Sequence, residues 1–125
     1  MSSKNLWADL SQVEKIPTPR TILLEQADYL TKGTSGMLVG SVGEGFYGEN
    51  LRYSLNIKVP ALNNYLVSIL AADHGIDLYP VHLVALRPPT DFMCRDEAEF
   101  EKAVGSVLAS EEVKTMLSRL LSQLK

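Results

Sequence analysis

The sequence has a single cysteine, Cys94, so no disulfide can form within the chain. No apolar stretch approaches the roughly 20 residues that a membrane-spanning helix needs. Near the start, Asp9 and Glu14 interrupt any apolar segment of the kind found in a secretory signal. The net charge is −3, and there is no run of five like charges to form a basic arm for a phosphate backbone. These absences predict a cytoplasmic protein with no membrane and no nucleic-acid partner.

The length of 125 residues, with 46% hydrophobic and 22% charged residues, is typical of one globular domain. A chain of this size hides about two thirds of its unfolded surface when it folds, which gives a core without disulfides. We expect a single α+β domain over residues 17–125. Residues 1–16 are expected to form an N-terminal arm or a short helix before it.

Four apolar residues recur at helical spacing near the start of the chain: Leu6, Trp7, Leu10 and Val13. They predict a short helix over residues 3–15. Two prolines then force an extended link at residues 16–19. Thr18 and Pro19 are typical of a helix cap and a first helical residue, so a second helix is expected from there to about Lys32.

The apolar pattern then changes to a period of two, which predicts β-strands. We expect four strands, at residues 36–42, 50–59, 64–72 and 79–86. A glycine-rich turn at 43–50 and a turn at Asp73-His74-Gly75 separate strands, and Pro88-Pro89 is expected to end the sheet. Short connections predict an antiparallel meander.

Two more helices are expected near the end of the chain, at residues 95–108 and at 111–124 after a Ser110 cap. The predicted fold is therefore α+β, with a four-stranded antiparallel meander preceded by one or two helices and followed by two C-terminal helices. The third and fourth strands are apolar on both sides. Either the helices divide between both faces of the sheet, or a second copy covers one face, and we predict a homodimer.

The densest polar cluster is Asp73-His74-Gly75-Ile76-Asp77. His74 is a candidate base or ligand, with Asp73 or Asp77 as its orienting or ligating partner. A zinc site normally has three or four ligands, and His82 is the other histidine of the chain. We favour a turn whose aspartates bond to local backbone, and we predict no metal and no cofactor.

Three further motifs have a plain structural explanation. Residues 43–48 match G-x-G-x-x-G, but a strand rather than a helix is expected to follow, so a hairpin loop is favoured over a nucleotide site. Cys94 has no histidine paired with it in sequence and is interpreted as structural rather than nucleophilic. Four polar residues alternate along the second strand, at Arg52, Ser54, Asn56 and Lys58. We expect them to form a solvated face rather than an anion or RNA site, because aromatic residues for base stacking are not interleaved on that face.

Leu6, Trp7 and Leu10 are the candidate interface residues. A helix containing them either covers the domain's own sheet or docks on a partner. With no catalytic group of residues evident, we predict a non-enzymatic protein-interaction or self-associating module. The alternative is a small hydrolase, or a ligand- or metal-binding domain, centred on Asp73, His74 and Asp77.

Several segments of the chain carry a resemblance to a known family. They are Pro17-Thr18-Pro19 leading into Ile22-Leu23-x-Glu25-Gln26-Ala27-x-x-Leu30, then Asp77-Leu78-Tyr79-Pro80-Val81, Glu99-Phe100-Glu101 and Ser110-Glu111-Glu112-Val113. Together they resemble a family of small uncharacterised bacterial proteins, a domain of unknown function. The resemblance covers most of residues 17–124 but not the segment around Trp7. It implies a bacterial, soluble, single-domain protein and assigns no activity and no site residue.

Overall fold

A computed structural model describes residues 3–124 of the chain as an α+β domain preceded by an arm. Its helices are α1 (Pro19–Gly33), α2 (Glu97–Leu108) and α3 (Glu111–Ser122). Its strands are β1 (Val39–Tyr47), β2 (Asn50–Val59), β3 (Tyr65–His74), β4 (Val81–Leu86) and β5 (Pro89–Cys94). Short 3₁₀ turns lie at Leu10–Gln12 and Pro60–Leu62.

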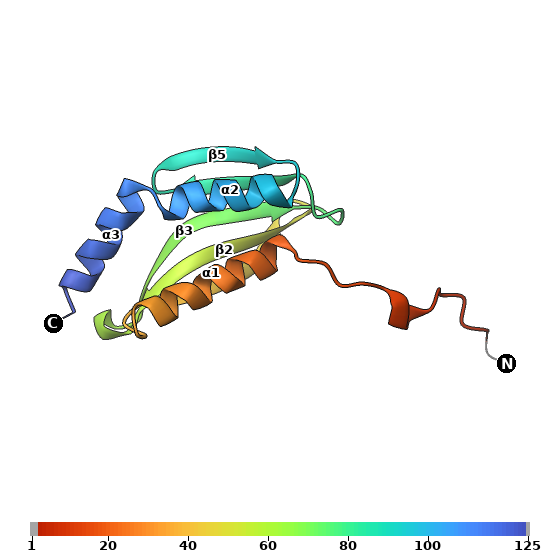
Figure 1. Cartoon of the computed structure of the whole chain (residues 1–125), viewed down its shortest axis with the longest axis horizontal. Coiled ribbons are helices and arrows are strands. Elements are labelled where there is room, and N and C mark those ends of the chain that lie inside the picture. Colours follow the sequence, from red (N-terminus) through yellow and green to blue (C-terminus); the bar gives the residue numbers. More distant parts are fainter. Residues whose placement is uncertain (1–2, 125) are drawn as a thin grey trace.

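The five strands form one antiparallel meander in the order β1-β2-β3-β4-β5. Helix α1 packs mainly on β1 and β2, and α2 packs on β4 and β5, so both helices cover the same face of the sheet (Figure 1). Helix α3 turns away from α2 at one end of the domain, and its Val113 and Leu120 join the core there. The predicted antiparallel meander is therefore confirmed, but with one strand more than expected.

The helix starts follow the capping residues of the sequence. The Thr18 hydroxyl oxygen accepts a hydrogen bond from the Thr21 backbone N–H at 3.1 Å. Ser110 accepts from the Val113 N–H at 3.2 Å. Each cap satisfies a backbone donor that the first turn of a helix leaves without a partner. The expected starts of α1 and α3 are thus confirmed.

The prediction that Pro88-Pro89 ends the sheet is wrong. Leu86 and Pro89 face each other across β4 and β5, so Arg87 and Pro88 form a two-residue turn between these strands. Pro89 is the first residue of β5, and β5 is an edge strand. A proline is tolerated there because the first residue of an edge strand has no need to donate to a neighbour.

Three other boundaries also differ from the expectation. Strand β1 continues to Tyr47, so residues 43–47 are strand and the turn to β2 is only Gly48 and Glu49. Strand β3 continues to His74, which places Asp73 and His74 inside the sheet rather than in a turn. The helix expected over residues 3–15 is replaced by extended chain with the Leu10–Gln12 turn.

The second face of the sheet has no helix on it among the described residues, so the helices do not divide between the two faces. Its side chains alternate along each strand with those of the core and are mostly polar or small, and three of them, Asn56, Ala71 and Asp73, are buried. The apolar ones on this side include Val84, which is half-buried, and Leu86 and Met93, which are exposed. Strands β3 and β4 have apolar residues on both sides, but only the side covered by the helices forms the core. The apolar residues on the other side are a few side chains on an open face.

Candidate functional site

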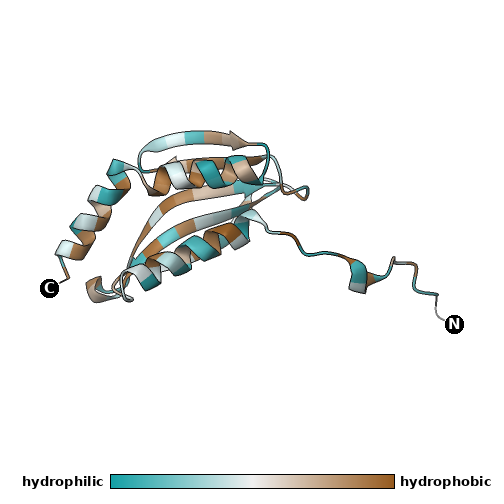
Figure 2. Cartoon of the chain, viewed as in Figure 1, coloured by the Kyte–Doolittle hydropathy of each residue, from teal (hydrophilic) through white to brown (hydrophobic). Residues whose placement is uncertain are grey.

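The N-terminal arm, defined as residues 3–17, extends away from the domain (Figure 1). Its large apolar side chains are exposed, and Trp7 leaves 76% of its surface open to solvent. Hydrophobic and hydrophilic residues alternate along it (Figure 2). The arm does not cover the domain's own sheet, so the expectation that Trp7 packs there is wrong.

The direction of the arm follows from its junction with α1. Pro17 and Pro19 have fixed φ angles, and the residue before each proline is held in an extended conformation. Thr18 has φ −115° and ψ 163°, which is fully extended. The junction is therefore a stiff strut that directs the arm outward from the start of α1.

Other exposed apolar side chains gather at the same end of the domain. Phe46 lies near the end of β1, and Ile76, in the loop after β3, is 95% exposed. An ion pair between Arg20 and Glu44 joins the start of α1 to the end of β1, so the arm begins beside this tip. Monomeric proteins rarely leave several large apolar side chains together in solvent, which marks this end as an interaction surface.

Helices α1 and α2 leave an open groove between them. Its lining includes Ile22 and Gln26 from α1 with Val104, Gly105 and Leu108 from α2, and its volume is about 510 Å³. An apolar cavity of about 130 Å³ continues it toward α3, and both spaces share Gln26 and Leu108. A segment lying in this groove would contact both helices at once.

On the open face of the sheet, Arg52 and Asp73 form a two-pronged ion pair. Arg52 Nε lies 2.5 Å from Asp73 Oδ1 and Nη2 lies 2.7 Å from Oδ2. Asp73 is 2% exposed, whereas a third of the Arg52 side chain is exposed. The Arg52 guanidinium also lies 4.3 Å from the centre of the Tyr47 ring. The pair raises the pKa of Arg52 further, chiefly through its hydrogen bonds to Asp73.

His74 faces the opposite side of β3 and is buried in the core. Its ring stacks on Tyr53 with centroids 5.6 Å apart, and Nδ1 lies 2.8 Å from the Gly75 carbonyl oxygen. Its Nε2 is buried without a hydrogen-bond partner. Because neighbouring residues of a strand point to opposite faces, Asp73 and His74 cannot act on one substrate together.

Asp77 lies in the exposed loop after β3, outside the strand that holds Asp73 and His74. Within residues 3–124, no group of three or more His, Cys, Asp or Glu side chains is placed to hold a metal ion. The structure therefore disperses the candidate site of Asp73, His74 and Asp77, which sequence proximity suggested. Asp73 has a structural partner, and His74 is a core residue.

No activated nucleophile occurs around β5 and α2. Cys94 is buried, and this burial, with Glu99 and Asp96 nearby, raises the pKa of its thiol. Burial and the charge of Glu97 raise the pKa of Tyr79 to about 12. Both groups stay protonated at neutral pH, so neither is prepared to attack a substrate or to accept a proton.

We expect Cys94 to react slowly with a thiol reagent in the folded protein, because the thiolate is the reacting form and the sulfur is enclosed. The check is labelling with a chromogenic disulfide at pH 8. The rate of Cys94 labelling in the folded protein should be at least 100-fold below that in the unfolded chain. The reaction that remains would proceed through local opening of the fold. A Ser11→Cys variant places a second thiol on the exposed arm as a control that should react at once. Equal rates for both thiols would contradict the enclosed position of Cys94.

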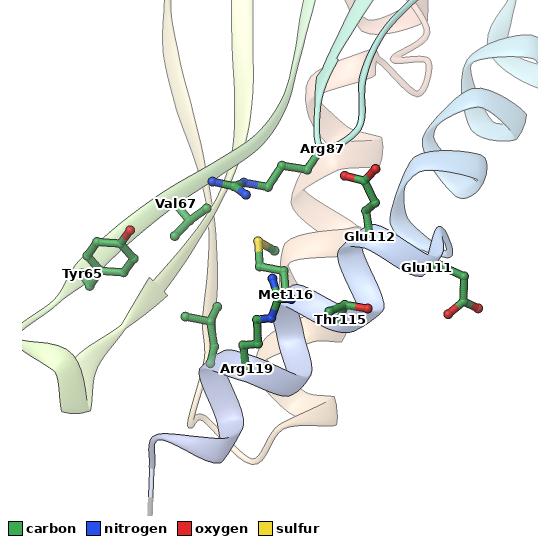
Figure 3. A pocket seen from close by; sticks show the side chains of 9 residues that line it. Tyr65, Val67, Arg87, Glu111, Glu112, Thr115, Met116 and Arg119 are labelled. Atoms are coloured by element: carbon green, nitrogen blue, oxygen red, sulfur yellow. The ribbon is translucent and has the colours of Figure 1, made fainter.

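A further pocket of about 470 Å³ lies between the start of β3, the turn after β4, and α3. Arg87 and Arg119 extend toward it, while Glu111 points away (Figure 3). The rim mixes two guanidinium groups with the carboxylates of Glu111 and Glu112, and all four residues are exposed. An exposed rim of mixed charge binds no single class of small molecule strongly, so this pocket ranks below the arm and the groove.

Comparisons of this chain with protein-family models, curated proteins and solved structures find no match. The resemblance to a bacterial family thus stays a prediction. None of the helices within residues 3–124 has the length and the apolar character needed to cross a membrane.

Sequence reasoning identified the arm but missed the groove and the ion pair of the open face. The groove depends on how far apart α1 and α2 lie on the sheet, which no local pattern records. The ion pair depends on the register in which Arg52 on β2 faces Asp73 on β3. A sequence signal was present for it: two oppositely charged residues, each on a predicted strand or at its end.

Proposed function

We propose that this protein is a non-enzymatic self-associating module of the cytoplasm, which forms a homodimer through its N-terminal arm. The observation that carries the proposal is the exposure of Leu6, Trp7 and Leu10 on a segment that a proline strut holds away from the domain. Aromatic and large aliphatic side chains of this kind are the usual anchors of protein interfaces. The burial and protonation of Cys94, and the separation of Asp73 from His74, support a role without turnover.

The single-residue test is Trp7→Ala. A buried aromatic anchor contributes about 2 kcal/mol or more to an interface, and a homodimer contains two copies of Trp7. The loss of both should therefore raise the dimer dissociation constant roughly 1,000-fold. Removal of residues 1–15 should leave a monomer at the same concentrations. Sedimentation velocity over a dilution series measures both effects.

Tyr65→Ala is the matched control, because Tyr65 is an exposed aromatic residue at the start of β3, outside both the arm and the α1–α2 groove. This variant should associate like the unaltered protein. If the unaltered chain is monomeric at every concentration, or if the arm-deleted chain dimerises equally well, the proposed function is wrong.

A further inference from the structure

The groove between α1 and α2 has room for a large side chain at one particular place. A Cβ placed on Gly105 would meet no atom within 4 Å, so the α2 backbone is open to the groove there. Ala109, one turn further along, is also small. Ile22 and Val104 form a buried apolar floor below. An aromatic ring can therefore lie flat against α2 over Gly105.

The cavity that continues the groove is almost wholly apolar. Its lining includes Leu30 of α1, Leu55 and Ile69 of the sheet, and Leu117 of α3. Its volume of about 130 Å³ is close to that of apolar cavities that stay dry and admit a benzene-sized group. It is large enough for one apolar side chain and too apolar to hold ordered water.

The arm has the pattern of residues that this groove requires. The arm is extended in the structure apart from the Leu10–Gln12 turn, so docking as a helix requires it to coil. Once helical, it places Leu6, Leu10 and Val13 on one side, because they are four and then three residues apart. The arm has no net charge, because Asp9 and Glu14 balance Lys4 and Lys15, so its apolar side chains rather than its charge match the groove. Recognition of an amphipathic helix in an apolar groove uses apolar anchors spaced in this way.

The proline-containing segment at residues 16–19 determines whether the arm enters the groove of its own molecule or that of a second copy. Residues 16–18, which precede the first helical residue Pro19, carry the chain roughly 9 Å outward from the start of α1 when extended. To return to its own groove, the arm would have to reverse direction immediately before Pro17. A neighbouring molecule can accept the arm without such a reversal.

We propose that the arm of each copy docks in the α1–α2 groove of a second copy, with Trp7 lying over Gly105 of its partner. This inference rests on the proposed self-association and assigns its binding site. One arm buries roughly 500 Å² through its large apolar side chains, which are Leu6, Trp7, Leu10, Val13 and Ile16. Two arms, each covering a similar area of groove, bury roughly 2,000 Å², which is within the range of stable dimers.

The first test is Gly105→Leu, which fills the groove over the expected Trp7 position. Leucine is the better helix former, so the domain stays folded, as circular dichroism would verify. The dimer dissociation constant should rise roughly tenfold or more. Ser106→Leu is the matched control, since Ser106 lies on the side of α2 that faces β5, and it should leave dimerisation unchanged.

The second test uses the fluorescence of Trp7, the only tryptophan in the sequence. A chain lacking residues 1–15 has the groove but no tryptophan, whereas the Gly105→Leu chain has the arm but a filled groove. Adding the arm-deleted chain to the Gly105→Leu chain should shift Trp7 emission to the blue and reduce its quenching by acrylamide. Adding a chain with both changes should do neither.

The outcomes separate this inference from the proposed function. If arm deletion dissociates the dimer but Gly105→Leu does not, the module self-associates and the groove is the wrong site. If Trp7 is shielded in a monomer at every dilution, the arm occupies its own groove and exchange between copies is wrong. If Trp7 is exposed and the chain is monomeric throughout, the proposed function fails as well.

Discussion

Replacement of Arg52 by alanine is expected to destabilise the domain by about 3 kcal/mol, because it leaves the enclosed carboxylate of Asp73 without its counter-charge. Breaking a buried ion pair usually costs 3–5 kcal/mol, and the partial exposure of Arg52 places this pair at the lower end. The guanidinium contact with Tyr47 is lost as well. Urea denaturation measures the change, and the melting temperature should fall by roughly 10 °C.

Arg20→Ala is the matched control, since Arg20 also pairs with a carboxylate, that of Glu44, across two elements of the fold. Both partners of that pair are about half exposed, so its removal should cost less than about 1 kcal/mol. Asp73→Asn should cost less than Arg52→Ala, because the guanidinium that it leaves behind can reach water. Equal losses for Arg52→Ala and Arg20→Ala would show that Asp73 is hydrated in solution rather than enclosed.

The ion pair shows why sequence reasoning misplaced the polar cluster. Asp73-His74-Gly75 resembles a turn because aspartate and glycine favour turns. In the sheet, the cross-strand partner of Asp73 overrides that local preference, since Arg52 neutralises the charge that would otherwise exclude Asp73 from a strand. Local propensity describes the residues of a segment but not what faces them across the sheet.

Elements with strong periodicity and a capping residue were predicted well. Helix α1 was expected from Thr18 to about Lys32 and spans Pro19–Gly33, and α2 and α3 lie within two residues of their predicted bounds. Strand β2 matches its prediction because one face is apolar and the other polar. Strand β5 was missed because it is a short edge strand that begins with proline and has little apolar alternation.

The candidate site was predictable only in part for the same reason. Leu6, Trp7 and Leu10 were identified from the sequence because apolar residues recur at a regular local spacing in the arm. The exposure of these three side chains was not predicted. It depends on whether the proline-containing segment at residues 16–19 allows the arm to fold back onto the domain. The groove over Gly105 arises from the packing of two helices about 70 residues apart, which is a property of the tertiary structure alone.

Replacement of Gly40 by alanine is expected to have an effect of similar size to that of Arg52→Ala. A Cβ at Gly40 would lie 2.5 Å from the Ala27 Cα and 2.7 Å from its carbonyl carbon, and it would also overlap the carbonyl oxygen. These are backbone atoms of α1, so no side chain can move aside. The helix itself would have to shift away from β1, at a cost of about 3 kcal/mol.

That shift would also disturb what holds α1 in place. The Gly40 backbone N–H donates to the Thr31 hydroxyl at 2.9 Å, and Thr31 in turn donates to the Ala27 carbonyl at 3.1 Å. Gly45→Ala is the control on the same strand, because a Cβ there meets nothing within 4 Å, and it should leave stability within about 0.5 kcal/mol. Calorimetry of both variants measures the difference.

The close approach at Gly40 determines the position of α1 on the sheet, and thereby the width of the groove that faces α2. Gly40→Ala should therefore weaken dimerisation beyond what its loss of stability explains, when association is measured at temperatures where the variant is fully folded. Arg52→Ala lies on the opposite face of the sheet and should leave dimerisation unchanged under the same condition. If both variants impaired association equally, the effect would follow from stability alone, and the geometry of the groove would have no part in it.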